Sequence, residues 1–168
     1  MKKLIIYSFL FYSAFIHTQE EFSNHISKKE IKYLNSYFDA EKYKVLEEYE
    51  KSLALYEECI SIYPQESSAY NEIAKIYFYL QDWSNAEYYI NEALLLDPNN
   101  KWYHYLLLDI YFVQGNLQSQ VIVYTKLIDL DENQFTYYIQ KLDRLRQLKQ
   151  YKKAIKFIKE STRDFGKS

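Results

Sequence analysis

The sequence predicts an all-α protein, an α-solenoid of about four helix-turn-helix repeats. Two observations lead to this prediction. Large apolar residues stand 34 residues apart, at Tyr49, Trp83, Leu117 and Tyr151. Within each period, apolar residues twice follow the three-and-four spacing of one helix face. Because a pair of amphipathic helices cannot bury its apolar faces alone, neighbouring pairs must stack into a continuous core.

The first residues, MKKLIIYSFLFYSAFIHTQE, are typical of a signal peptide. A positively charged start precedes an apolar run from Leu4 to Ile16, which is too short to span a bilayer as an ordinary helix. We expect residues 1–18 to be a signal peptide cleaved before Gln19, and the mature protein to be exported to the periplasm or cell envelope. An uncleaved N-terminal membrane tether and a buried helix remain as alternatives.

Residues 19–32 lead into the array, and the first helix is predicted to begin near Ser27. In the segment SKKE, the Ser27 side chain can cap the helix while Glu30 reaches back to the backbone of Ser27, as in a capping box. The array itself is predicted to cover residues 33–168, with repeats at 33–66, 67–100, 101–134 and 135–168.

The clearest repeat is 67–100. Its first helix has an apolar face, and after a break at Leu-Gln-Asp its second helix has another, at Ala86, Tyr89, Ile90, Ala93 and Leu94. Asp82 is a good N-cap for the second helix, because its carboxylate can accept from free N–H groups of the first turn. Pro98 lacks the N–H that would continue this helix, so the helix is predicted to end before it.

In this register, residues 33–168 resemble the tetratricopeptide repeat family. The second copy matches its pattern at Tyr70, Ile73, Ala74, Tyr77, Ala86, Ile90, Ala93 and Pro98. The first and fourth copies match less completely. The third replaces both small Ala positions, with Gln120 and Leu127, and these larger residues are expected to spread its two helices.

The resemblance implies a protein-protein interaction module or scaffold. In the family, the first helix of each repeat lines a concave groove, and the matching positions here are expected to form an aromatic groove for a partner peptide or protein: Phe78, Tyr79, Trp102, Tyr105, Asp109 and Phe112. The helix predicted to contain Trp102 and Phe112 needs only Leu107, Leu108 and Tyr111 for its core face. The same helix has a second apolar stripe, formed by Trp102, Tyr105 and Phe112. This stripe is expected either to bind a partner or to contact the neighbouring repeat.

Some relatives hold the C-terminal carboxylate of a chaperone tail with Lys, Asn and Arg side chains. That clamp looks absent, because the corresponding positions hold residues such as Glu72, Trp102 and Leu106. A carboxylate would meet an acid and apolar surfaces there instead of cations.

No residue pattern indicates an enzyme, a cofactor or a metal site. The single cysteine, Cys59, excludes disulfides within the chain and falls where the family places a small buried residue. His104 has no His or Cys at ligand spacing, and no glycine-rich loop is present to hold phosphate. A net charge of −2 and a sequence pI near 6.0 also make nucleic acid a poor partner.

Charge is distributed unevenly along the chain. Residues 33–66 hold 3 basic and 8 acidic residues, whereas residues 135–168 hold 10 basic and 3 acidic ones. This basic end, with Lys152, Lys153 and Lys156, is either a solvated surface or a site for an acidic protein, anionic lipid or the acidic first repeat of another copy. The last option predicts salt-sensitive head-to-tail self-association.

A further expectation concerns the end of the array. The fourth period ends at Ser168, so Phe157 and Phe165 are expected to lack the cover that another repeat would give. The main alternative to a peptide-binding module is a self-assembling structural unit, or a truncated relative of a longer repeat protein with no independent activity.

Overall fold

The computed structural model describes residues 27–165, and the regular secondary structure among them is entirely helical. The predicted signal peptide and most of the lead-in lie outside the described residues. None of the helices in the described range is long and apolar enough to cross a bilayer. The chain divides into two compact units, one ending at Tyr63 and the other beginning at Pro64.

The first unit is a hairpin of α2 (Lys28–Val45) and α3 (Tyr49–Ile62). The predicted start of the first helix is confirmed, because Ser27 is the N-cap of α2 and its hydroxyl accepts a hydrogen bond from the Glu30 N–H at 3.1 Å. The first helix therefore begins before the repeat register alone would place it.

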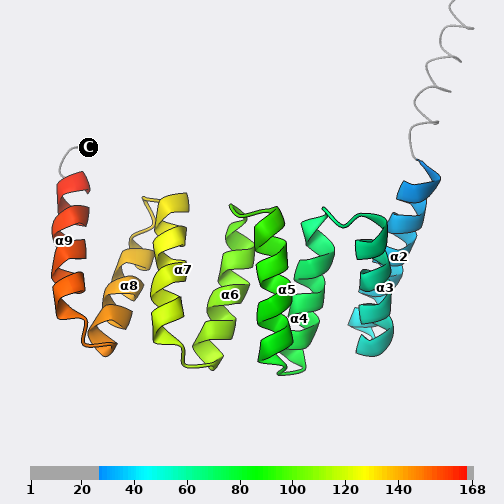
Figure 1. The fold of residues 1–168 in the computed structure, drawn as a ribbon, viewed down its shortest axis with the longest axis horizontal. Helices are drawn as coiled ribbons and strands as arrows, with labels where there is room; N and C mark the ends of the chain where they lie inside the picture. The colour runs from blue at the N-terminus through cyan, green and yellow to red at the C-terminus, as the bar shows by residue number, and fades with distance from the viewer. Residues whose placement is uncertain (1–26, 166–168) are drawn as a thin grey trace, which may run out of the picture. The chain divides into compact units, whose positions relative to one another are not determined.

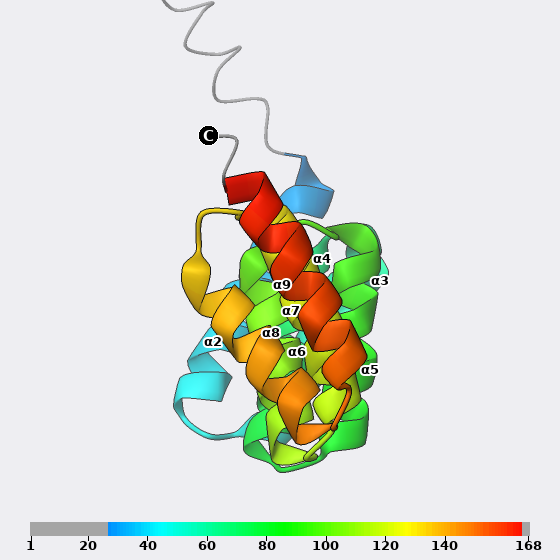
Figure 2. The same cartoon turned by 90° about the vertical axis from the view of Figure 1, so that its left-hand side faces the viewer.

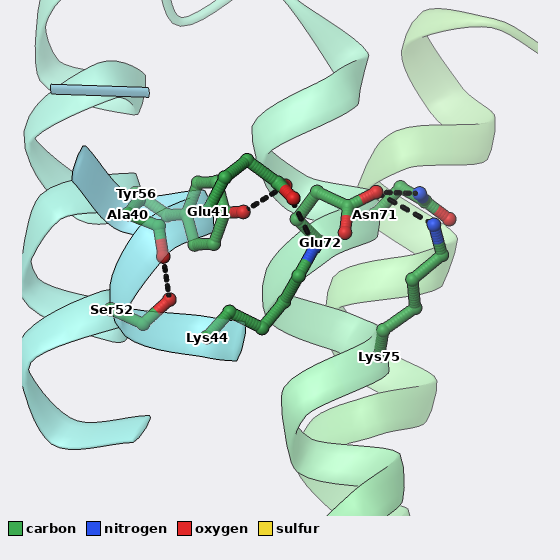
Figure 3. A network of polar contacts seen from close by, with 8 residues as sticks. All are labelled: Ala40, Glu41, Lys44, Ser52, Tyr56, Asn71, Glu72 and Lys75. Atoms are coloured by element: carbon green, nitrogen blue, oxygen red, sulfur yellow. Dashed lines mark hydrogen bonds and ion pairs between the residues drawn. The ribbon is translucent and has the colours of Figure 1, made fainter. Parts of the chain in front are cut away.

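Small residues allow α2 and α3 to approach closely. Ala40 and Ser52 are both fully buried, and the Ser52 hydroxyl donates to the Ala40 carbonyl at 2.8 Å (Figure 3). The hydroxyl of the buried Tyr56 donates to the Glu41 carboxylate, which also pairs with Lys44 at 2.7 Å. A buried ring thus has its polar end paired at the edge of the hairpin.

The second unit contains α4 (Ser67–Tyr79), α5 (Trp83–Leu96), α6 (Lys101–Val113), α7 (Leu117–Leu130), α8 (Phe135–Gln147) and α9 (Tyr151–Phe165). Within this unit successive helices run antiparallel in a row, and each contacts the next (Figure 1). Viewed along the row, α6 and α8 lie on one side and α5, α7 and α9 on the other (Figure 2). We call α4, α6 and α8 the A helices and α5, α7 and α9 the B helices.

The eight described helices confirm the predicted all-α fold of about four helix-turn-helix repeats. Residues 34 apart begin the second helix of each pair, at Tyr49, Trp83, Leu117 and Tyr151. The turn inside each pair repeats as well, because one residue per turn has φ near +60°: Glu47 (59°), Gln81 (60°), Gly115 (66°) and Lys149 (57°). This left-handed conformation favours glycine, yet only one of the four positions has it.

The second copy forms the most regular part of the core. Ala74, Ala86, Ile90 and Ala93 are fully buried between α4, α5 and their neighbours. The predicted limits of α5 are confirmed. The Asp82 carboxylate accepts from the Asn85 N–H at 3.2 Å, and the helix ends at Leu96, before Pro98.

In the third copy, the larger Gln120 is accommodated by hydrogen bonding. Gln120 and Leu127 are buried, and α6 and α7 pack less closely than α4 and α5, as expected. The Gln120 amide donates to the Tyr111 carbonyl at 2.9 Å, and its carbonyl accepts from Arg144 Nε at 2.6 Å. The buried amide therefore links α6, α7 and α8.

The expectation that Phe157 lacks cover is wrong. Its ring is partly buried and stacks on Tyr138 of α8, with ring centroids 5.7 Å apart. The Lys141 ammonium lies 4.1 Å from the centre of the same ring. Phe157 shares a helix face with the half-buried Ala154, so it packs against its own hairpin instead of facing outward. The side chain of Phe165 lies outside the described residues.

Candidate functional site

The side of α6 that faces away from its core is aromatic. The helix starts at Asn100, whose side-chain oxygen accepts from the Trp102 N–H at 3.2 Å. Tyr103, Leu107 and Ile110 are buried on one side of the helix. The opposite side, which we call the α6 face, contains Trp102, Tyr105, Asp109 and Phe112. Trp102 is 77% exposed and Phe112 is 65% exposed.

Tyr105 is the member of the α6 face that contacts the neighbouring repeat. Its ring lies 5.7 Å from the Trp102 ring, and its hydroxyl is hydrogen-bonded to the hydroxyl of Tyr137 on α8. Contact with a neighbour therefore explains part of the burial of Tyr105. The same explanation does not apply to Trp102 and Phe112, whose large apolar surfaces face solvent.

Asp109 gives the α6 face its charge. Although much of the residue is exposed, partial burial of its carboxyl group raises the pKa of Asp109 above its ordinary value. No ion pair to Asp109 is present within residues 27–163. A basic group from a ligand would stabilise the ionised form of this carboxyl group.

On α4, the predicted site residues have different environments. Phe78 is partly buried against the core and lies edge-on to Trp83, with ring centroids 5.3 Å apart, whereas Tyr79 is 65% exposed. The buried Glu72 accepts hydrogen bonds from Asn71 Nδ2 at 3.0 Å and from Lys75 Nζ at 2.7 Å (Figure 3). Of the two predicted site residues on α4, only Tyr79 is largely exposed.

The structure adds two exposed apolar residues on α8 that the sequence analysis did not select. Ile139 is 64% exposed and occupies the same register position as Tyr105 one period earlier, and Phe135 is 60% exposed at the start of the helix. Moving the register of Tyr105 forward by one more repeat would have identified Ile139.

Cys59 and His104, the two side chains most often found in catalytic or metal sites, are both buried. The Cys59 thiol is buried and 3.7 Å from the Tyr33 carbonyl, and burial raises its pKa to about 11. His104 is buried, with Nε2 2.9 Å from the Pro98 carbonyl. Within the part of the chain that the structure describes, no group of three or more His, Cys, Asp or Glu side chains could hold a metal ion.

The residues of the predicted basic end are all on α9. Lys152, Lys153 and Lys156 are exposed, and Lys156 Nζ lies 3.7 Å from the Glu160 carboxylate. An exposed pair at this distance contributes little to stability, so Lys156 remains available to a partner.

Comparisons with known proteins agree with this architecture. Residues 67–100 match the family model of the tetratricopeptide repeat. A search of curated proteins found no match.

Three solved structures are similar in fold. The first tetratricopeptide domain of Spaghetti (RPAP3), bound to the HSP90 peptide SRMEEVD, aligns with a TM-score of 0.60 and 19% identity over 74% of this chain and 98% of that one. MamA aligns with a TM-score of 0.61 and 14% identity over 80% of this chain and 79% of that one. YrrB, a tetratricopeptide protein with an unusual peptide-binding site, aligns with a TM-score of 0.60 and 16% identity over 87% of this chain and 73% of that one. Residues 67–100 thus match a tetratricopeptide repeat, and the chain has the fold of a tetratricopeptide repeat protein.

Proposed function

We propose that this protein is a protein-interaction module and that its α6 face binds a peptide segment of a partner protein. The observation that carries the proposal is the exposure of Trp102 and Phe112 on one helix face, opposite the buried side of the same helix. Large aromatic side chains are the usual anchors of an interface, and covering each would contribute about 1.5–3 kcal/mol.

The similar structures support a peptide ligand in general terms. The Spaghetti domain is bound to a peptide that ends in an acidic segment, and YrrB has a peptide-binding site. An acidic segment does not suit the α6 face, because Asp109 would repel it and Trp102 stands where the resemblance places a cation. The chemistry of the face favours a peptide with apolar side chains for Trp102 and Phe112 and one basic residue for Asp109.

Library selection followed by binding measurements would test this proposal. Peptides selected on the purified chain should be enriched in apolar residues and in Lys or Arg. In fluorescence anisotropy, Trp102→Ala and Phe112→Ala should each weaken binding of a selected peptide by about 1–3 kcal/mol. Asp109→Asn should weaken the peptide that has the basic residue, but not a version with Gln in its place.

Tyr88→Ala is the matched control for these variants. Tyr88 is 57% exposed on α5, away from the α6 face, so its removal should leave the affinity unchanged. Equal affinities for the wild type, Trp102→Ala and Phe112→Ala, with all three folded by circular dichroism, would refute the proposed site.

We further propose that the module acts after export, in the periplasm or cell envelope. The support is the basic start and the apolar run from Leu4 to Ile16. N-terminal sequencing of the mature protein should begin near Gln19. Recovery of intact Met1 in a soluble cytosolic fraction would contradict export.

A further inference from the structure

One face of α9 consists of residues whose equivalents in the preceding B helix, α7, lie toward the next A helix, α8. In α7, which contacts α8, Val121 and Tyr124 are each 8% exposed. Gln118 accepts a hydrogen bond at 2.9 Å from Gln150, directly after α8. One period later, Gln118, Val121 and Tyr124 correspond to Lys152, Ile155 and Ile158.

The second repeat uses the same positions in the same way. Ile90 of α5 is fully buried, and the Glu87 carboxylate accepts from the hydroxyl of Tyr111 on α6 at 2.9 Å and from Nε2 of Gln114, the C-cap of α6, at 3.1 Å. Two B helices thus present these positions to the A helix that follows. The equivalent face of α9 is therefore shaped to receive a helix.

In α9 this face is exposed. Ile155 is 54% and Ile158 is 45% exposed, and among the described residues no helix covers them. The view along the row in Figure 2 shows α8 and α9 at this end of the second unit. A shallow hollow of about 520 Å³ runs along the helix, lined by Lys152, Ile155, Lys156, Lys159, Glu160 and Arg163. We call this surface the α9 face.

The charge of the α9 face specifies the chemistry of its ligand. Lys152, Lys156, Lys159 and Arg163 are spaced by four, three and four residues, so they follow one side of the helix beside Ile155. Glu160 is the single acid lining the hollow. A ligand that covers the two isoleucines must therefore bring acidic groups next to its own apolar residues.

We propose that the α9 face binds an acidic amphipathic helix of a partner protein, lying antiparallel to α9 as α8 lies on α7. In this orientation the N-terminal half of the partner helix meets Lys159 and Arg163, and its C-terminal half meets Lys152. Acidic residues in the first turns of the partner helix are favoured both by these cations and by its own helix dipole. The surface is separate from the α6 face and does not depend on the function proposed for it.

A second copy of this chain is a less suitable ligand. A continued array would offer the exposed stripe of α2, formed by Ile31, Phe38 and Val45. That helix holds five lysines, Lys28, Lys29, Lys32, Lys42 and Lys44, against the acids Glu30, Asp39 and Glu41. The acidic surplus of residues 33–66 lies instead on α3 and in the turns that flank it. Two basic helices would repel each other at this contact.

A pair of designed peptides would test the proposal on the full chain. Both form amphipathic helices of about 18 residues with the same apolar stripe, and one has Glu and the other Lys at the flanking positions. By fluorescence anisotropy at about 150 mM salt, the Glu peptide should bind about tenfold or more tightly than the Lys peptide. The double variant Lys152→Glu, Lys159→Glu should reverse this preference, and Ile155→Ser should weaken both peptides.

Lys153→Glu is the matched control, because Lys153 is exposed on α9 but does not line the hollow. It should keep the preference for the Glu peptide. Equal binding of both peptides, no binding of either, or the same loss in Lys153→Glu as in the double variant would overturn the proposal. Loss of Glu-peptide binding in Trp102→Ala would also overturn it, since the peptide would then occupy the α6 face.

Two other ligands are distinguished by parallel measurements. Cosedimentation with phosphatidylglycerol vesicles, without binding of the Glu peptide, would assign the α9 face to anionic lipid and refute a partner helix. A salt-sensitive increase in mass by light scattering that disappears in the Lys152→Glu, Lys159→Glu variant would assign the face to a second copy and refute it as well.

Discussion

The repeated left-handed residue in the helix-turn-helix turns gives the sharpest prediction about stability. Gly115 and Gln81 occupy equivalent turns with φ of 66° and 60°. An added Cβ at Gly115 meets no atom within 4 Å, so Gly115→Ala changes only the backbone preference. Gln81 is exposed, so Gln81→Gly is the reciprocal change at a site with little side-chain contact.

The expected change in the free energy of unfolding follows from two opposing effects. A left-handed conformation costs a non-glycine residue about 1–2 kcal/mol in the folded state. The smaller freedom of alanine in the unfolded chain returns about 0.4–1 kcal/mol. Gly115→Ala should therefore lower the free energy of unfolding by about 1 kcal/mol by the balance of these terms, and Gln81→Gly should raise it by a similar amount.

Thermal and urea unfolding, followed by far-UV circular dichroism, would measure both effects. A change of about 1 kcal/mol corresponds to about 3 °C in Tm for a chain of this length. Gln81→Ala is the control, because it removes the side chain but keeps the same backbone cost, and it should leave Tm unchanged. If Gln81→Gly is less stable than Gln81→Ala, the strain assigned to this turn is wrong.

Four further predictions concern polar side chains at the contacts between helices. Gln120→Leu should lower the free energy of unfolding by about 2 kcal/mol in urea titrations, because Nε of the largely buried Arg144 loses its acceptor while its Nη1 keeps Asp143. Tyr111→Phe should cost about 1 kcal/mol in the same assay, since the Glu87 carboxylate loses its hydroxyl donor. The Cys59 thiol, with its pKa raised to about 11, should react with iodoacetamide at pH 8 only when the protein unfolds. The pKa of Glu58 is lowered by hydrogen bonds from Lys32 and Ser36, so Glu58→Gln should reduce Tm at neutral pH, and the difference should vanish as the pH falls through the folded-state pKa.

The helix pattern could be predicted because its signals are local. The cap at Asp82, the stop before Pro98 and the capping residue Ser27 each act within one helical turn, and the structure has all three. The position of Trp102 and Phe112 on a second side of α6 also followed from the pattern, because this helix has more apolar residues than its core side needs. Periodicity therefore predicts which residues share a face.

Features that depend on pairing between elements could not be predicted. Three of the four left-handed turn residues are not glycine. The residue types at Glu47, Gln81 and Lys149 therefore do not indicate their positive φ. The pairing of Gln120 with Arg144 joins different repeats and requires the structure. The wrong expectation for Phe157 has the same origin, since only the contact with α8 shows which side of α9 is covered.

The contacts within the second unit explain why its two proposed surfaces can be studied separately. Cross-helix hydrogen bonds here join residues of the same or adjacent repeats: Ser67 and Tyr103 are 36 positions apart, Tyr105 and Tyr137 are 32 apart, and Gln120 and Arg144 are 24 apart. In such an array each helix is stabilised by its nearest neighbours, so a substitution changes local contacts and its effect fades with distance along the row. Trp102 is exposed on α6, whereas the α9 face adjoins α8, and α7 and α8 lie between α6 and α9 in the row (Figure 1). Substitutions at the two surfaces should therefore act independently, and a loss of binding at one can be assigned to that surface without invoking a change at the other.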